Sequence, residues 1–124
     1  MDIQNILVVC VGNICRSPTA EFLLKKNHPD LHIESAGLSA MVGHPADDKA
    51  IACMDALNID MRSHVAKQIT PELIKKADLI LVMSTNQQKH IEQTWPFAKD
   101  KVFRGQIDKV LNYLHPEVDN VLLQ

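Results

Sequence analysis

A cysteine and an arginine stand six positions apart near the start of this 124-residue chain, at Cys10 and Arg16. Gly12 and Asn13 lie between them and Ser17 follows directly. Glycine and asparagine tolerate left-handed backbone angles, so this stretch can curl tightly and turn its amide groups inward. A thiol can attack as a nucleophile, and a guanidinium can hold two oxygens of an oxyanion. The pattern therefore predicts a loop that binds a phosphate-like group above a reactive sulfur.

The backbone of this loop is expected to supply much of the binding. N–H groups that converge on one point form a nest for an anion, and the positive end of a following helix adds to the field. Five loop residues are predicted to line the phosphate site: Val11, Gly12, Asn13, Ile14 and Cys15. The planar fork of Arg16 can hold a phosphoryl group more tightly as its geometry changes in the transition state.

Three residues are predicted to be catalytic: Cys10, Arg16 and Ser17. A helix N-terminus and an arginine favour the thiolate form of Cys10, which is the form that attacks. The hydroxyl of Ser17 could donate to that sulfur and ease its departure when a thiophosphate is hydrolysed. Ser17 could also be the N-cap of the next helix, and the two functions are compatible. In a purely structural interpretation, Cys10 ends a buried strand and Arg16 is a solvated charge.

Hydrophobic patterns around the loop predict the elements that position it. Residues 5–10 form a continuous apolar run, typical of a strand covered on both faces. Further strands are predicted at 31–35, 78–83 and 101–104, and helices from Ser17, over 46–58, from Thr70-Pro71-Glu72, and from Ser84 with Gln87. The order predicts one α/β domain over residues 1–124, a three-layer fold with a short parallel four-stranded sheet and helices on both faces. The phosphate loop would follow the first strand.

The chain resembles the low-molecular-weight protein tyrosine phosphatases, and within them the bacterial branch paired with capsule or exopolysaccharide tyrosine autokinases. The resemblance runs from Ile6 to about Arg104. It is carried by VCVGNICRSPTAE, which begins at Val9, and by ESAG, GHPAD, SHVAKQ and ADLILVM, which begin at positions 34, 43, 63 and 77. It implies hydrolysis of phosphotyrosine through a cysteinyl-phosphate, without a metal or organic cofactor. The implied partner is a tyrosine-phosphorylated protein such as a bacterial tyrosine autokinase.

The resemblance also implies supporting residues. Ser35 and His64 would join Asn13 and Ser17 in a hydrogen-bond network that holds the loop, and Leu38, Met41 and Val42 would lie beside the substrate entrance. A reversible disulfide between Cys10 and Cys15 is implied as well. From the residues alone, Cys15 could equally be a small apolar filler under the loop. Cys53, Trp95 and Phe97 are expected in the core, and the cysteine spacing does not favour zinc.

Residues 105–124 depart from the family, which supplies its general acid from an Asp-Pro sequence followed by an aromatic residue. No Asp-Pro occurs in this sequence, and Asp108 and Asp119 are the weak candidates that remain after Arg104. We therefore expect a weakened acid step and an atypical, truncated C-terminus. The family also has a long closing helix, which this sequence is not expected to form. The sheet face that such a helix would cover is then left exposed, and this predicts self-association.

Composition narrows the function classes. A formal charge of -2 gives no global attraction to nucleic acid or an anionic membrane. The sequence has no apolar stretch long enough for membrane insertion and an odd number of cysteines, which predicts a cytoplasmic protein with thiols. Two alternatives to the phosphatase remain open. One is a phosphotyrosine- or oxyanion-binding module with little turnover, and the other is an arsenate reductase, which would need two further redox cysteines near Cys10.

Overall fold

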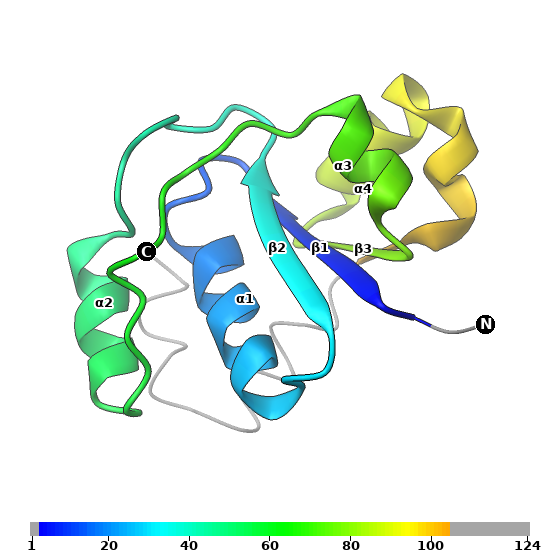
Figure 1. Ribbon diagram of the computed structural model, residues 1–124. Coiled ribbons are helices and arrows are strands. Elements are labelled where there is room, and N and C mark those ends of the chain that lie inside the picture. The colour runs from blue at the N-terminus through cyan, green and yellow to red at the C-terminus, as the bar shows by residue number, and fades with distance from the viewer. Residues whose placement is uncertain (1–2, 105–124) are drawn as a thin grey trace.

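A parallel four-stranded sheet forms the centre of the computed structural model, which describes residues 3–104 (Figure 1). The strands are β1 (Asn5–Cys10), β2 (His32–Gly37), β3 (Leu79–Val82) and β4 (Val102–Arg104). They lie in the order β2-β1-β3-β4, and every neighbouring pair is parallel. The continuously apolar β1 is therefore an inner strand, as its composition predicts.

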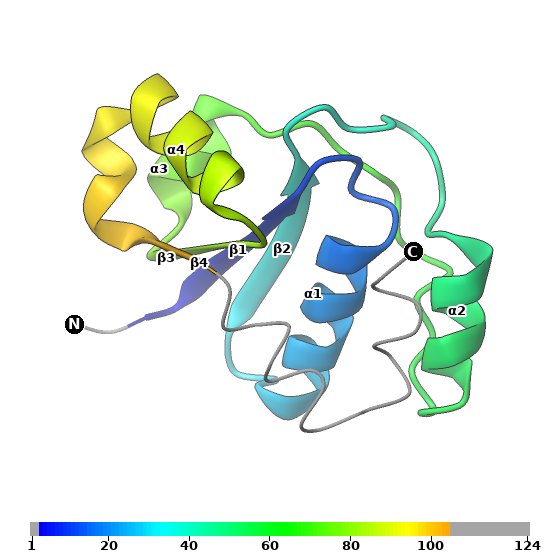
Figure 2. The ribbon, with the colours of Figure 1, turned by 180° about the vertical axis from the view of Figure 1, so that it is seen from behind.

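Helices cover both faces of this sheet, as Figures 1 and 2 show from opposite sides. On one face lie α1 (Arg16–Asn27) and α2 (Asp48–Asp55), and on the other lie α3 (Pro71–Lys76), α4 (Thr85–Thr94) and the 3-10 helix η1 (Pro96–Lys101). The predicted fold class, α/β with a parallel sheet between two helical layers, is confirmed. Within residues 3–104, no helix is both long and apolar enough to cross a membrane.

Alternation along β1 divides the core in two. Ile6, Val8 and Cys10 pack in the cluster shared with α1 and α2, whereas Leu7 and Val9 pack in the cluster shared with α3 and α4. Successive strand residues point to opposite faces of a sheet, so the length of β1 decides on which side its last residue lies. Cys10 consequently ends the strand on the α1 side, directly before the loop.

Several element boundaries differ from those predicted. Helix α1 begins at Arg16 with Cys15 as its N-cap, and no side chain caps it, so Ser17 is not the cap. Strand β2 starts at His32 and continues through Gly37, beyond the predicted end at position 35. Helix α2 is shorter than the predicted 46–58. The carboxylate of Asp47 accepts from two backbone amides as the N-cap, so the helix begins at Asp48, and it ends at Asp55.

The start of α4 carries half of the predicted capping box. The hydroxyl of Ser84 accepts from the backbone N–H of Gln87, at 3.2 Å. The side-chain Oε1 of Gln87 then accepts from the N–H of Met83, at 2.7 Å, instead of the N–H of Ser84.

Of the two aromatic residues expected in the core, Trp95 packs partly buried against the α3 and α4 cluster, but Phe97 is 56 % exposed.

Candidate active site

The predicted loop joins the carboxyl end of β1 to the start of α1, at the edge of the sheet where parallel α/β folds place their sites. Cys10 is the last residue of β1 and Arg16 is the first of α1. Asn13 has a positive φ of 59°, as the residue type suggested. Gly12 does not adopt a left-handed angle, so that part of the prediction was wrong.

Every carbonyl oxygen from Cys10 to Cys15 accepts a hydrogen bond from outside the loop. The donors, in order of the carbonyls, are the backbone N–H groups of Leu38, Ser39 and Met41, the side chain of His64, and the backbone N–H groups of Asp47 and Thr19. The distances run from 2.7 Å to 3.1 Å. In a planar peptide the N–H points away from the C=O, so carbonyls that are turned outward direct the intervening amides inward.

The sulfur of Cys10 lies between two polar groups. The backbone N–H of Asn13 points to Sγ at 3.3 Å, and the hydroxyl oxygen of Ser17 lies 2.9 Å from Sγ. All three residues are buried. These contacts place a hydrogen-bond donor and a hydroxyl at the sulfur.

The side chain of Asn13 connects the sulfur to β2 and to the 63–68 segment. Its Nδ2 donates to the hydroxyls of Ser17 and Ser35, both at 2.9 Å, while its Oδ1 accepts from the backbone N–H of Lys67 at 2.9 Å. The Lys67 amide can only donate, which sets the orientation of the Asn13 carboxamide. Because Ser17 accepts from Asn13, its own hydrogen is left to point at Sγ of Cys10.

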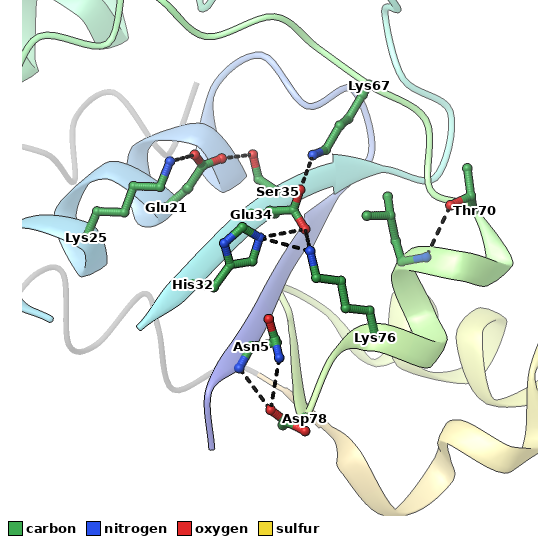
Figure 3. Close-up of polar contacts among 11 residues, drawn as sticks. Asn5, Glu21, Lys25, His32, Glu34, Ser35, Lys67, Thr70, Lys76 and Asp78 are labelled. Carbon is green, nitrogen blue, oxygen red and sulfur yellow. Dashed lines mark hydrogen bonds and ion pairs between the residues drawn. The ribbon is translucent and has the colours of Figure 1, made fainter. Parts of the chain in front are cut away.

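Glu21 ends this chain of hydrogen bonds, and sequence reasoning missed it. The hydroxyl of Ser35 donates to Glu21 Oε1 at 2.6 Å, and Lys25 Nζ donates to Oε2 at 2.5 Å (Figure 3). Glu21 is only 8 % exposed, so its carboxylate requires such partners. Its position four residues before Lys25 on a helix was the available signal.

His64 and Gly37 hold the outer side of the loop. Nε2 of His64 lies 2.7 Å from the carbonyl oxygen of Asn13, and because a carbonyl only accepts, this nitrogen carries the hydrogen. At the end of β2, a Cβ on Gly37 would lie 2.4 Å from the carbonyl oxygen of Val11. Only glycine lets β2 approach the loop this closely. In the sequence, Gly37 was noted only as the last residue of the ESAG motif, which gave no sign of this close approach.

Lys67 ties the 63–68 segment to the exposed edge of β2 through Glu34 (Figure 3). Its Nζ lies 2.9 Å from Glu34 Oε1, and Lys76 Nζ lies 3.7 Å from Oε2. Partial burial opposes ionisation of Glu34, but the hydrogen bond from Lys67 and the nearby positive charges hold the pKa of its carboxyl below the usual range. These pairs help to keep the backbone of Lys67 beside Asn13.

A cavity of about 250 Å³ opens above the loop. Its walls are the seven consecutive residues from Cys10 to Arg16, together with Gln87 from α4. The five predicted phosphate-site residues, Val11 to Cys15, therefore surround one cavity together with Arg16 and the sulfur of Cys10. Ser17 lies buried behind that sulfur. Gln87 was predicted only as part of a helix cap. Nothing in the sequence around it indicated that its side chain would also line this cavity.

The three apolar residues expected at the entrance divide into two groups. Met41 and Val42 are 44 % and 64 % exposed, and Met41 lies next to Gly12. Leu38 instead packs against the core cluster of α3 and α4, because its position directly after β2 turns it towards that face. Val11, within the loop, is 54 % exposed and adds to the apolar surface outside the cavity.

Cys15 is a thiol close to the nucleophile candidate, and no disulfide forms among the cysteines, all of which lie within residues 3–104. Burial first, then the charge of Asp47, raises the pKa of Cys15 to about 11. At neutral pH this sulfur is therefore protonated. Cys53 packs partly buried against the α1 and α2 core cluster, as expected.

No carboxylate lines the cavity among the residues that the structure describes. The two candidates for a general acid, Asp108 and Asp119, lie outside the described residues, as does the C-terminal surface for which self-association was predicted. The described residues thus form an oxyanion site with a sulfur at its base.

Comparison with known proteins agrees with this geometry. The family model for low molecular weight phosphotyrosine protein phosphatase matches residues 5–117. The chain is 66% identical over 104 residues to the low molecular weight protein-tyrosine-phosphatase Ptp of Acinetobacter johnsonii, covering 84% of this chain and 73% of that one. It is 48% identical over 104 residues to Wzb of Escherichia coli K12, covering 84% and 67%.

A solved structure matches over almost the whole length. The tyrosine phosphatase Wzb from Escherichia coli K30, in complex with sulphate, superposes with a TM-score of 0.82 at 29% identity, covering 97% of this chain and 94% of that one. The family predicted from the motifs is thereby confirmed. The chain belongs to the low molecular weight phosphotyrosine protein phosphatases and is a protein-tyrosine-phosphatase.

Proposed function

We propose that the chain hydrolyses phosphotyrosine in two steps, with Cys10 as the nucleophile. The thiolate attacks phosphorus, the P–S bond forms, and the P–O bond to the phenol breaks. Water then attacks the cysteinyl-phosphate, which releases inorganic phosphate and returns the thiolate. Arg16 binds two phosphoryl oxygens, and the loop amides from Val11 to Arg16 bind the charge that spreads over the oxygens in the transition state.

The outward carbonyls of the loop carry this proposal. An anion placed among peptide groups is attracted by N–H and repelled by C=O, so a loop that exposes both would bind it poorly. Here all six carbonyls from Cys10 to Cys15 are engaged elsewhere, which supports a cavity lined by donors. The hydrogen-bond chain through Asn13, Ser17, Ser35 and Glu21 supports a thiolate, because it leaves the Ser17 hydrogen directed at the sulfur.

We propose that the acid step is weak. A tyrosine leaves as a phenolate whose conjugate acid has a pKa of about 10, and a positioned acid accelerates such a departure by about 10² to 10⁴. No carboxylate lines the described cavity wall, and the sequence contains no Asp-Pro. Binding and charge stabilisation by the loop would still drive phosphoryl transfer.

We infer that the substrate is a tyrosine-phosphorylated protein, with a bacterial tyrosine autokinase as the partner. The support is the similarity to Wzb and Ptp, together with the apolar exposed side chains of Val11, Met41 and Val42 outside a cavity that takes a phosphoryl group. The reaction requires reduced Cys10, so we propose that it takes place in a reducing compartment, the cytoplasm.

The two alternatives differ from this proposal in what they require. A binding module would need the same oxyanion cavity without turnover. An arsenate reductase would need two further redox cysteines near Cys10, and Cys53 instead belongs to the α2 side of the core. The described site favours neither.

Hydrolysis of p-nitrophenyl phosphate by the purified chain, compared with Cys10→Ser, tests the proposal. The unsubstituted chain should release phosphate at a steady rate. Cys10→Ser should lose turnover but still bind inorganic phosphate in calorimetry, because the amides and Arg16 remain. Phosphate binding without turnover in the unsubstituted chain would instead establish the binding module. Full turnover by Cys10→Ser would exclude Cys10 as the nucleophile.

A further inference from the structure

Gln87 stands opposite the loop in the wall of the active-site cavity. The other described lining residues form one continuous run, from Cys10 to Arg16, so Gln87 is the contribution of a different element, α4. It is separated from Arg16 by 71 positions in sequence and reaches the cavity through the fold. A side chain at this place meets whatever occupies the space above the sulfur.

Hydrogen bonds at the start of α4 determine which end of the Gln87 carboxamide is available. Oε1 accepts from the backbone N–H of Met83 at 2.7 Å. The backbone N–H of Gln87 is engaged with the hydroxyl of Ser84. Within residues 3–104, Nε2 makes no hydrogen bond. The carboxamide is thus held by its oxygen and presents two N–H groups as donors.

Each non-bridging oxygen of a phosphoryl group can accept more than one hydrogen bond, so donors on the loop and a donor on another element can serve the same group. The loop amides and Arg16 approach the oxygens from the β1 and α1 side, whereas a donor on α4 approaches from across the cavity. A neutral amide adds a hydrogen bond without adding another fixed charge. Hydrogen bonds to a charged oxygen are about twice as strong as those between neutral groups.

We propose that Gln87 is a substrate-contacting residue whose Nε2 donates to a phosphoryl oxygen of phosphotyrosine. The inference rests on the proposed function, because it places the phosphoryl group in the cavity above Cys10. The proposal also assigns a role to the hydrogen bond that Gln87 Oε1 accepts from the backbone N–H of Met83. This hydrogen bond would orient the carboxamide so that its N–H groups face the substrate.

The competing interpretation is that Gln87 only stabilises the first turn of α4. Two substitutions and one control separate these interpretations. Gln87→Met has the same length but loses both the donor and the acceptor. Gln87→Glu keeps an oxygen that can accept from Met83 and replaces the donor with a charged acceptor. Ser84→Ala removes the neighbouring helix cap, at 3.2 Å from the Gln87 N–H, without changing a residue of the cavity wall.

The experiment measures binding of inorganic phosphate to each full-length variant by calorimetry, and thermal unfolding of the same samples. We expect Gln87→Met to bind phosphate about tenfold more weakly, as for a lost hydrogen bond to a charged group. Gln87→Glu should bind more weakly still, although it unfolds close to the unsubstituted temperature. Ser84→Ala should unfold at a lower temperature and bind phosphate within about twofold of the unsubstituted chain.

Three other outcomes would contradict the proposal. Phosphate binding by Gln87→Met that equals the unsubstituted chain would overturn the contact with the phosphoryl group. So would a loss in Ser84→Ala as large as that in Gln87→Met, because helix stability alone would then explain it. If the unsubstituted chain did not bind phosphate, the oxyanion cavity itself would be refuted, and the role of Gln87 with it.

Discussion

The hydroxyl oxygen of Ser17 lies 2.9 Å from the sulfur of Cys10, and because Asn13 donates to the same hydroxyl, the hydroxyl hydrogen can point at the sulfur. The side chain of Ser17, the second residue of α1, thus joins the helix to the end of β1 at the sulfur. A sulfur that receives a hydrogen bond leaves more readily as a thiolate.

Ser17→Ala should slow breakdown of the cysteinyl-phosphate by about tenfold to a hundredfold, as expected for one hydrogen bond to a charged group. Stopped-flow measurement of p-nitrophenol release should then show a burst before a slow steady rate. Thr19→Val is the matched control. It removes another buried hydroxyl of α1, which makes no hydrogen bond within the described residues. An unchanged steady rate in Ser17→Ala would contradict the role of Ser17.

Gly37→Ala should destabilise the loop from the side of β2. The added methyl would lie 2.4 Å from the Val11 carbonyl oxygen, so the strand or the loop must shift. We expect a loss of about 1 to 3 kcal/mol in the free energy of unfolding, typical of overpacking, and weaker phosphate binding. Urea unfolding and phosphate calorimetry measure the two effects.

Gly43→Ala provides the comparison for Gly37→Ala. Gly43 has a φ of +85° but no atom within 4 Å of an added Cβ, so the substitution should cost about 1 kcal/mol of backbone strain. Phosphate affinity should remain unchanged. If both variants bound phosphate equally, the close approach of Gly37 to Val11 would not determine the shape of the loop.

Alkaline pH should destabilise the fold through Cys15. Its pKa is raised in the folded protein from an ordinary 9.0 to about 11, so the native thiol holds its proton more tightly than the unfolded one. This contribution to stability is complete below the unfolded pKa and is lost as the pH rises through the folded pKa. The difference in urea midpoint between about pH 8 and about pH 11 should therefore be smaller in Cys15→Ser, whose hydroxyl does not titrate. An equal difference in the two proteins would contradict the prediction.

The rate should depend steeply on the leaving phenol if the acid is weak. Aryl phosphates whose phenols have graded pKa values measure this directly, since a working acid cancels the charge that develops on oxygen. Phenols of low pKa should be released much faster than tyrosine-like ones. Asp108→Asn and Asp119→Asn are the informative variants. A flat series that becomes steep in one of them would identify that aspartate as the acid and refute the weak acid step.

Local signals predicted the part of the site that is continuous in sequence. The apolar run of residues 5–10 indicated a strand buried on both faces, and the loop with the start of α1 followed from residue types within eight positions of Cys10. Such features depend on short-range sterics and hydrophobic periodicity, which a sequence displays directly. Ser17 was ambiguous because serine suits both a helix cap and a hydrogen bond to sulfur.

Contacts between distant positions were not predictable in the same way. The Asn13 carboxamide meets the backbone of Lys67, 54 positions away, and no residue type is required for a backbone N–H. Gln87 carried a capping signal that was correct for its backbone, but the packing of α4 against the sheet decided where the side chain points. Leu38 was expected at the entrance, and the direction of the chain after β2 packs it, partly buried, against the core cluster of α3 and α4.

The outward carbonyls of the loop also limit how this motif can be transferred. Five of their six donors come from residues 38–64, so the eight-residue sequence does not by itself contain what holds its amides inward. In a short peptide with the same sequence, water would hydrate those carbonyls. They would not be held outward and could turn towards an anion. Grafted onto another strand and helix, the motif should bind phosphate only if the host supplies donors equivalent to Leu38, Asp47 and His64.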